Sequence, residues 1–447
     1  MMLTWLCALA LGAGTTQPAK TSPAQWRAQQ RAAAEKSEKI LREAEKVRGL
    51  LGQYQVRQAA YLQDNSTAFR LIFGQYLSWH QTYLGLYAEA RKSFSIAQEP
   101  SPEDAPPPLD HGYKPQAAIE AIPRLAKDAR AVFLNEAHNA PVTRSLTVPL
   151  LARLRAEGFD TFAAETLYET DKDLQQRGYP TVDSGFYTQE PVYGEMVRTA
   201  LRLGYKVIAY EAVSDATGDA REREQARLLY ERSLKKDPKA RLVVNAGYGH
   251  IVEGGAYLGG RSMAQHFREI AGVDPLTVEQ TMLIEHGLAA EDHPYYRAAV
   301  EAAHVDKPTV FMDAAGKAWS LRPKGYDISV LFPPEQLVEG KRPAWLTLDG
   351  QRQPYAVAGD LCRGELPCMI EARYLAESEA AVPADRIVFG LLDPRLGLRE
   401  RARIRAAEMH SELYLRPGRY RLTVSNADNQ TIATQKIAVT EPGGATP

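Results

Sequence analysis

The 447-residue sequence carries almost no net charge, because 54 Lys and Arg residues balance 55 Asp and Glu residues and leave a net charge of -1. Proteins that bind nucleic acid or anionic membranes by electrostatics usually have a clear basic excess. The balance therefore gives no reason to expect a nucleic-acid partner, and a small molecule or a peptide suits this chain as a ligand.

Cysteine is also scarce, with three residues in the chain. Beyond Cys7, only Cys362 and Cys368 remain, and Gly364 and Pro367 lie between them. This short separation permits a small-loop disulfide, which fits an exported protein. The alternative is two free or metal-binding thiols. We predict the disulfide and see no sign of a catalytic cysteine pair.

Long apolar runs are absent except at the N-terminus. Residues 1–13 are uncharged and apolar but too short to span a bilayer, and small residues follow where a signal peptidase would cut. We predict a signal peptide over residues 1–19 and export to the periplasm or the extracellular space. No basic residue precedes the run, so an uncleaved anchor or a wrongly assigned start codon is the alternative. The mature chain has no predicted membrane span.

Two common hydrolase motifs are missing. The sequence contains neither G-x-S-x-G nor H-E-x-x-H, which argues against a serine α/β-hydrolase and a zincin. A near match to a phosphate-binding loop runs from Gly255 to Ser262, but Arg261 replaces its lysine. We expect no nucleotide there, although the helix start near Ser262 suits an anion.

The first part of the mature chain has helical periodicity. Residues 20–98 are rich in Ala, Glu, Lys, Arg and Gln, with apolar residues at helical spacing, which predicts a helical arm or hairpin. A stripe of aromatic residues with the same period is typical of packing surface. Its members are Phe69, Phe73, Tyr76, Trp79, Tyr83 and Tyr87. Residues 99–112 form a Pro-rich acidic linker that no helix can cross.

Residues 113–333 alternate short β-branched runs with amphipathic helices, which predicts an α/β domain with a mostly parallel sheet and flanking helices. The expected strands are 131–134, 161–164, 206–210, 241–245 and 278–284, with two further runs at 310–312 and 328–331. The expected helices lie near 144–157, 193–203, 220–236 and 262–271. Residues 334–447 show strands and turns without helical periodicity, which predicts a small β-rich, sandwich-like domain.

Acidic residues and histidines follow the ends of five successive expected strands. The C-terminal ends of parallel strands meet at one edge of the sheet, where ligands bind. A histidine there can take a proton from water, while carboxylates can orient the water or hold a divalent cation. The alternative is that these side chains cap helices or make buried hydrogen bonds. The residues are Glu136, His138, Glu165, Glu211, His250, Glu285 and His286.

Four segments resemble the superfamily that joins erythromycin esterases, ChaN-like haem-binding proteins and Tiki/TraB-type proteins. They are FLNEAHNAPVTR (133–144), the acid in AAETL (Glu165), REREQA (221–226) and VVNAGYGHIVEG (243–254). The likeness covers about a third of the chain. Asn135 stands where the family usually has a glycine before its first glutamate.

The resemblance implies a site made of Glu136, His138, Glu165 and His250, as catalytic residues or as metal ligands. It matches Arg144 and either Arg221 or Arg223 to the family's arginines, which we expect to bind substrate together with Tyr248. The leading hypothesis is a hydrolase of an ester or amide bond that uses a histidine-activated water and a divalent metal where one is needed. The alternatives are a haem- or metal-binding protein without turnover, with Tyr248 as a haem ligand, and an adaptor that binds a protein partner through its helical arm or C-terminal domain.

Overall fold

The computed structural model describes residues 21–338, 342–391 and 409–441, so the expected signal peptide lies outside the described residues and stays a prediction. The chain forms two compact units. Unit 1 takes in the described residues up to Phe94, the short segment Glu190–Val192 and the described residues from Leu337 onward; unit 2 takes in Ser95–Gln189 and Tyr193–Gln336. Within the described part of the chain, no helix is both long and apolar enough to cross a membrane.

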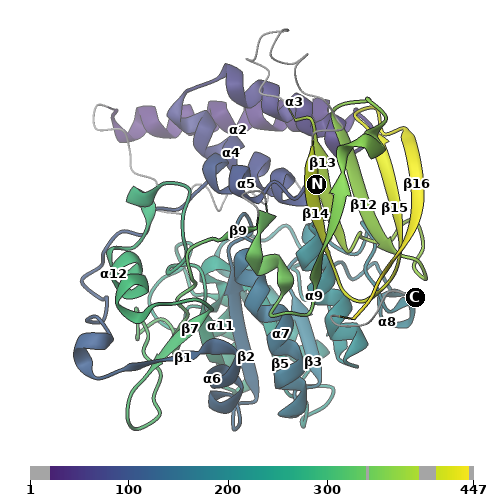
Figure 1. The fold of residues 1–447 in the computed structure, drawn as a ribbon. Helices are drawn as coiled ribbons and strands as arrows, with labels where there is room; N and C mark the ends of the chain where they lie inside the picture. Colours follow the sequence, from purple (N-terminus) through teal and green to yellow (C-terminus); the bar gives the residue numbers. More distant parts are fainter. Residues whose placement is uncertain (1–20, 339–341, 392–408, 442–447) are drawn as a thin grey trace. The chain divides into compact units, whose positions relative to one another are not determined.

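Unit 2 is built on a six-stranded sheet in which all neighbouring strands are parallel, which confirms the predicted fold class (Figure 1). The order across the sheet is β4-β3-β5-β2-β6-β8. The strands are β2 (Ala131–Glu136), β3 (Thr161–Ala164), β4 (Lys206–Ile208), β5 (Leu242–Gly247), β6 (Leu276–Glu279) and β8 (Ile328–Ser329). The helices of this region are α6 (Ala118–Leu125), α7 (Val142–Ala156), α8 (Leu174–Arg177), α9 (Pro191–Arg202), α10 (Asp219–Arg232), α11 (Met263–Ala271) and α12 (Pro294–Ala303).

The central strands are buried on both faces, as expected when helices cover both sides of a parallel sheet. Every residue of β2, β3 and β5 is buried. On one face, Phe133 of β2 packs its ring against Phe267 of α11, with 5.1 Å between the ring centroids. Helix α7 contacts β2 as well. The side chains at the C-terminal edge are therefore carried by a fully buried and tightly packed centre of the sheet.

The order of the central strands differs from their order in the chain. Although β2 and β3 are successive along the sequence, β5 lies between them and pairs with both. The ends of β2, β3 and β5 consequently lie side by side, and Glu136 is directly opposite Gly247 in the register.

Several expected strands end at other residues than predicted, and two of these differences change the sheet or its edge. The expected strand at 310–312 is β7 (Thr309–Met312), which forms a separate antiparallel pair with β1 (Lys114–Ala117) and does not join the parallel sheet. The expected strand at 278–284 is β6, which ends at Glu279. Beyond it, the amides of Thr281 and Met282 donate to the Glu279 carboxylate, and the Gln280 amide donates to the Asn135 side chain. These backbone N–H groups donate to side chains, so they are not available to pair with a neighbouring strand.

The Pro-rich segment 99–112 contains no α-helix or strand, only the short 3₁₀-helix η1 (Leu109–His111). It is part of unit 2 and is held to the rest of that unit by side-chain and backbone contacts. Asp104 pairs with His293 and Arg322, each at 3.1 Å, and the Trp319 indole donates to the Pro106 carbonyl. We call this segment the strap.

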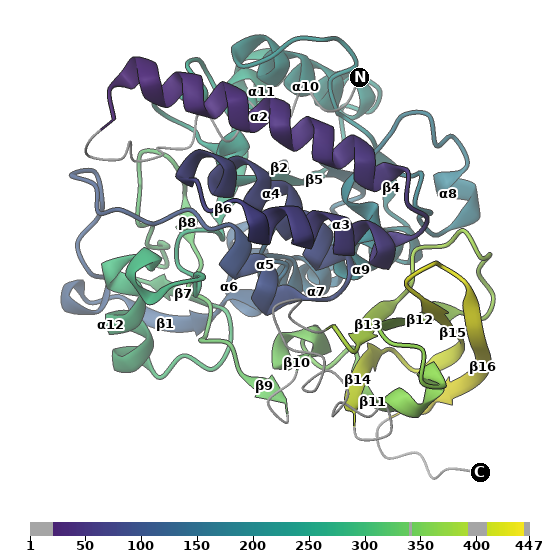
Figure 2. The ribbon, with the colours of Figure 1, turned by 90° about the horizontal axis from the view of Figure 1, so that it is seen from above.

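The helical part of unit 1 is a small bundle in which α2 lies along α3 and α4 (Figure 2). Its helices are α2 (Pro23–Glu45), α3 (Leu50–Gln63), α4 (Thr67–Tyr83) and α5 (Tyr87–Ser93). All six residues of the aromatic stripe are buried, which confirms its interpretation as packing surface. Leu51, Tyr54, Leu77 and Leu84 share a core with Met369 of the β-rich part, so the arm and the C-terminal region form one unit.

The C-terminal region of unit 1 contains two antiparallel sheets that share one hydrophobic core (Figure 2). One sheet has the order β13-β12-β15-β16, and the other pairs β11 with β14. The strands are β11 (Gln353–Ala358), β12 (Cys368–Tyr374), β13 (Asp385–Phe389), β14 (His410–Leu415), β15 (Gly418–Asn426) and β16 (Thr431–Val439); β9 (Leu337–Val338) and β10 (Arg342–Pro343) form a short separate pair. Cys362 and Cys368 are disulfide-bonded and fully buried in this core, which confirms the predicted pairing.

Candidate active site

Glu136 is the last residue of β2, and its carboxylate is fully buried. Arg144, in the first turn of α7, donates to both of its oxygens at 2.7 and 2.6 Å, and Asn245 of β5 donates at 2.8 Å. Burial alone would raise the pKa of Glu136, but the guanidinium of Arg144 outweighs it and lowers the pKa to about 2. Glu136 is therefore ionised and fixed in position.

His138 lies two residues after Glu136 and uses that carboxylate as a support. Its Nδ1 is 3.0 Å from Glu136 Oε1. The imidazole stacks on the ring of Tyr187 with 4.2 Å between centroids, and the ring of Tyr248 meets it edge-on. These contacts fix the ring so that Nε2 lies 3.9 Å from Glu165 Oε2.

His250 is supported in the same way by a different glutamate. Its Nδ1 is 2.8 Å from Oε2 of Glu222, which lies in the first turn of α10. The same oxygen accepts the backbone N–H of Met263, the first residue of α11, at 2.9 Å. A carboxylate at a helix N-terminus is favoured by the helix dipole. The Nε2 of His250 lies 3.4 Å from Glu165 Oε1.

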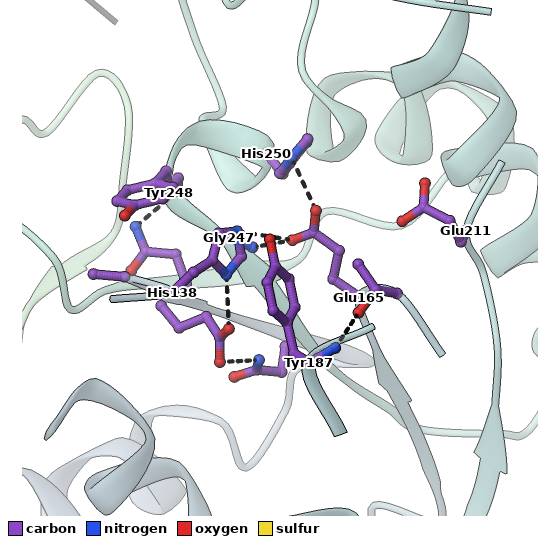
Figure 3. A network of polar contacts seen from close by, with 12 residues as sticks. His138, Glu165, Tyr187, Glu211, Gly247, Tyr248 and His250 are labelled. Atoms are coloured by element: carbon purple, nitrogen blue, oxygen red, sulfur yellow. Dashed lines mark hydrogen bonds and ion pairs between the residues drawn. The ribbon is translucent and has the colours of Figure 1, made fainter. Parts of the chain in front are cut away.

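Glu165 lies between the two histidines, one residue beyond the end of β3 (Figure 3). Its carboxylate also accepts the N–H of Gly247 and lies 3.5 Å from Arg221 Nη2. Burial would raise the pKa of Glu165, but His250, His138 and Arg221 hold it well below its ordinary value. The site thus consists of two Glu/His pairs that face one ionised carboxylate.

Gly247 is required for this approach. A Cβ at this position would lie 2.2 Å from His138 Nε2 and 2.9 Å from Glu165 Oε2. Any side chain here would push the histidine away from the carboxylate, because such distances are far below van der Waals contact.

The charge on His250 follows from its two acidic neighbours. Burial lowers the pKa of His250, but the carboxylates of Glu222 and Glu165 outweigh it and raise the pKa to about 10. At neutral pH, His250 is therefore an imidazolium, and its Nε2–H makes no hydrogen bond to Glu165 or to any other described residue. It can donate a hydrogen bond or a proton and cannot act as a base.

Arg221 connects this centre to Glu211. Its Nη2 lies 2.8 Å from Glu211 Oε1, and Gln225 donates to the same oxygen at 2.9 Å. The side chains of Arg221 and Glu211 are 16% and 22% exposed, whereas those of Glu165 and both histidines are at most 3% exposed. The Arg221 side is the part of the site that solvent reaches.

The structure separates the remaining predicted residues. Of the two arginines considered, Arg221 contacts Glu165, whereas Arg223 is exposed. Arg144 is buried against Glu136, so it supports the site, and its predicted role in binding substrate stays a prediction. The Tyr248 hydroxyl donates to Asn139 at 2.9 Å.

Glu285 and His286 do not follow a strand directly. Because β6 ends at Glu279, they lie six and seven residues beyond it. Glu285 accepts the backbone N–H of Glu335, and His286 pairs with Asp292 at 3.3 Å. Among the described residues, no hydrogen bond or ion pair joins either of them to the Glu165 centre, and their place in the site stays a prediction.

Glu222 is the main residue that the sequence analysis missed. It stands in REREQA beside Arg221, but the family resemblance directs attention to the arginines. A usable signal exists: Glu222 shares the buried face of α10 with Ala226 and Leu229, at helical spacing. A glutamate on the apolar face of a helix needs a buried partner. His250 is that partner.

The donor set fits a metal ion poorly. The carboxylate oxygens of Glu136 are already occupied by Arg144, Asn245 and His138. Among the described residues, no group of three or more His, Cys, Asp or Glu side chains is arranged to hold a metal ion. The Tyr248 hydroxyl, the candidate ligand under the haem-binding alternative, is bonded to Asn139. The residues present therefore do not fit a bound metal ion or haem iron.

Comparison with known proteins gives no family assignment, since no family model and no curated protein matches the chain. Among solved structures, the type III effector HopBA1 is 13% identical, with a TM-score of 0.28 over 40% of this chain and 94% of its own. RRSP, a MARTX toxin effector domain from Vibrio vulnificus, is 13% identical, with a TM-score of 0.28 over 60% of this chain and 66% of its own. A third structure, described as bacterial protein toxins, has a TM-score of 0.27. Likeness at this level carries no argument about function.

Proposed function

We propose that unit 2 hydrolyses an ester or amide bond with a water molecule activated by His138. One observation carries the proposal: the Nε2 atoms of His138 and His250 lie 3.9 and 3.4 Å from the two oxygens of one carboxylate, Glu165. Buried charged groups that shift one another's pKa values are typical of catalytic sites. Each histidine is also held by a carboxylate of its own, Glu136 or Glu222, an arrangement that orients both rings toward Glu165.

In the proposed reaction, His138 is the base. Its Nδ1–H is held by Glu136, which leaves Nε2 as the proton acceptor, and Glu165 orients the attacking water. Water loses one proton to His138 as its oxygen bonds to the carbonyl carbon. The imidazolium of His250 donates a hydrogen bond to the oxyanion that forms. The C–O or C–N bond then breaks, and His138 returns the proton to the leaving group.

A panel of nitrophenyl esters and fluorogenic peptides tests the proposal. We expect the full chain to hydrolyse at least one member, with or without EDTA, and His138→Ala to lose this activity because it removes the base whose Nε2 faces Glu165. The control is His111→Ala, which changes an exposed histidine of the strap. If the wild type and His138→Ala are equally inert across the panel, also with added Mn²⁺ or Zn²⁺, the proposed function is wrong.

The pH profile tests the role of His250. Its pKa of about 10 depends on Glu222 and Glu165, so the imidazolium of the wild type persists from neutral pH up to about pH 10. Glu222→Gln removes the stronger of the two charges that raise this pKa. The variant should lose kcat at a lower pH than the wild type, whereas Glu224→Gln, which changes a nearby acid bonded to Ser214, should not. Coinciding alkaline limbs for all three proteins would refute the role of His250 as an imidazolium.

A further inference from the structure

The segment from Gly255 to Ser262, which resembles a phosphate loop in sequence, forms a tight turn. The Tyr257 amide donates to the Gly260 carbonyl at 2.8 Å, and the Gly260 amide donates back at 3.0 Å. Leu258 and Gly259, the two central residues, have φ values of 50° and 81°. The helix that follows offers its first amide, that of Met263, to Glu222. A protein carboxylate thus binds where an anion was expected.

The turn places Tyr257 directly against His250. The two rings meet edge-on, with 5.2 Å between centroids and 71° between planes. The tyrosine ring lies over Gly249, where a Cβ would come within 2.5 Å of the ring. Asp219, at the start of α10, accepts the Arg261 amide at 2.8 Å and ties the loop to the helix that carries Glu222.

The hydroxyl of Tyr257 is buried and has no hydrogen-bond partner among the described residues. A buried phenol usually has a partner, so its absence here requires an explanation. Burial, and then the charges of Glu222 and Glu165, raise the pKa of Tyr257 well above its ordinary value. The hydroxyl therefore keeps its proton, and the two carboxylates that affect it are those that flank His250.

We infer that the Tyr257 hydroxyl is a catalytic hydrogen-bond donor that binds the oxyanion of the tetrahedral intermediate together with His250. The inference rests on the proposed hydrolase function. Preformed donors stabilise an oxyanion most when they are shielded from water, as this hydroxyl is. The tight turn, the glycine beneath the ring and the Asp219 anchor fix the donor before the substrate arrives.

Tyr257→Phe tests this inference, because phenylalanine keeps the ring packing on His250 and Gly249 and removes only the hydroxyl. With a substrate that the wild type hydrolyses, kcat should fall by about 100-fold while KM changes little, since losing one oxyanion donor costs this much in other hydrolases. The loss should be the same for esters with good and poor leaving groups. The melting temperature should stay close to that of the wild type.

The matched control is Tyr205→Phe, which removes a buried hydroxyl that donates to the Leu151 carbonyl at 2.8 Å. It should lower the melting temperature and leave kcat unchanged. If the wild type is active and Tyr257→Phe equals it in kcat, the inference fails while the proposed function stands. A loss that grows with the pKa of the leaving group assigns the hydroxyl to leaving-group protonation and overturns the oxyanion role. An inert wild type overturns both.

Discussion

Glu165→Gln should lower kcat/KM by about 10⁴-fold, comparable to the loss when the orienting acid of a catalytic triad is replaced by its amide. The amide has nearly the shape of the carboxylate, so the chain should still fold. It lacks the negative charge that faces Nε2 of both histidines and that helps to keep His250 protonated. Steady-state kinetics with a substrate of the wild type measure this loss.

Asp104→Asn is the matched control, because Asp104 is also a buried carboxylate placed between a histidine and an arginine, His293 and Arg322. It should lower the melting temperature and leave kcat/KM unchanged. Equal activity losses in the two variants would mean that Glu165 acts only through the stability of the fold, and the catalytic assignment would fall.

Arg144→Met should lower the free energy of unfolding by about 3–5 kcal/mol, the usual cost of leaving one charge of a buried ion pair without its partner. The side chains of Arg144 and Glu136 are at most 1% exposed, so water cannot replace the guanidinium. Urea unfolding followed by circular dichroism measures the change. The control on the same helix is Arg153→Met, whose exposed pair with Glu120 is worth less than about 1 kcal/mol.

The loss of unfolding free energy in Arg144→Met should depend on pH. In the wild type, Arg144 lowers the pKa of Glu136 to about 2, so the pair contributes its full stability above the ordinary carboxyl pKa of 4.5 and loses it as the pH falls toward 2. The difference between the variant and the wild type should therefore shrink over this range, because Glu136 becomes neutral. A deficit that is constant from pH 7 to pH 3 would contradict this account.

The sequence indicated Glu136, His138, Glu165 and His250 because each follows a short apolar run, and the structure brings all four together. It could not indicate their distances, which depend on β5 lying between β2 and β3. The order of strands in a sheet depends on packing between segments that are distant in the sequence. The local pattern of apolar and polar residues therefore does not predict it. The arm and the β-rich region were likewise visible as separate patterns, but their shared core around Met369 was not.

The errors have physical causes. The run from Val278 to Ile284 is apolar enough for one strand, yet the chain leaves the sheet at Glu279 because that carboxylate takes the amides of Thr281 and Met282. This shift places Glu285 and His286 six and seven residues beyond the end of the strand. Glu222 was missed because its helix is rich in charged residues, which suggests that each glutamate in it is exposed. Only its helical spacing from Ala226 and Leu229 indicates that it lies on the buried face.

The strap has a practical consequence for separating the two units. A linker that only joins domains can be cut at either end, but this segment supplies Asp104 to His293 and Arg322 and the Pro106 carbonyl to Trp319. A shortened chain that began at Tyr113 would leave those three side chains without these partners in unit 2. The cut that isolates unit 2 for crystallography or kinetics therefore belongs before Ser95, where the unit itself begins.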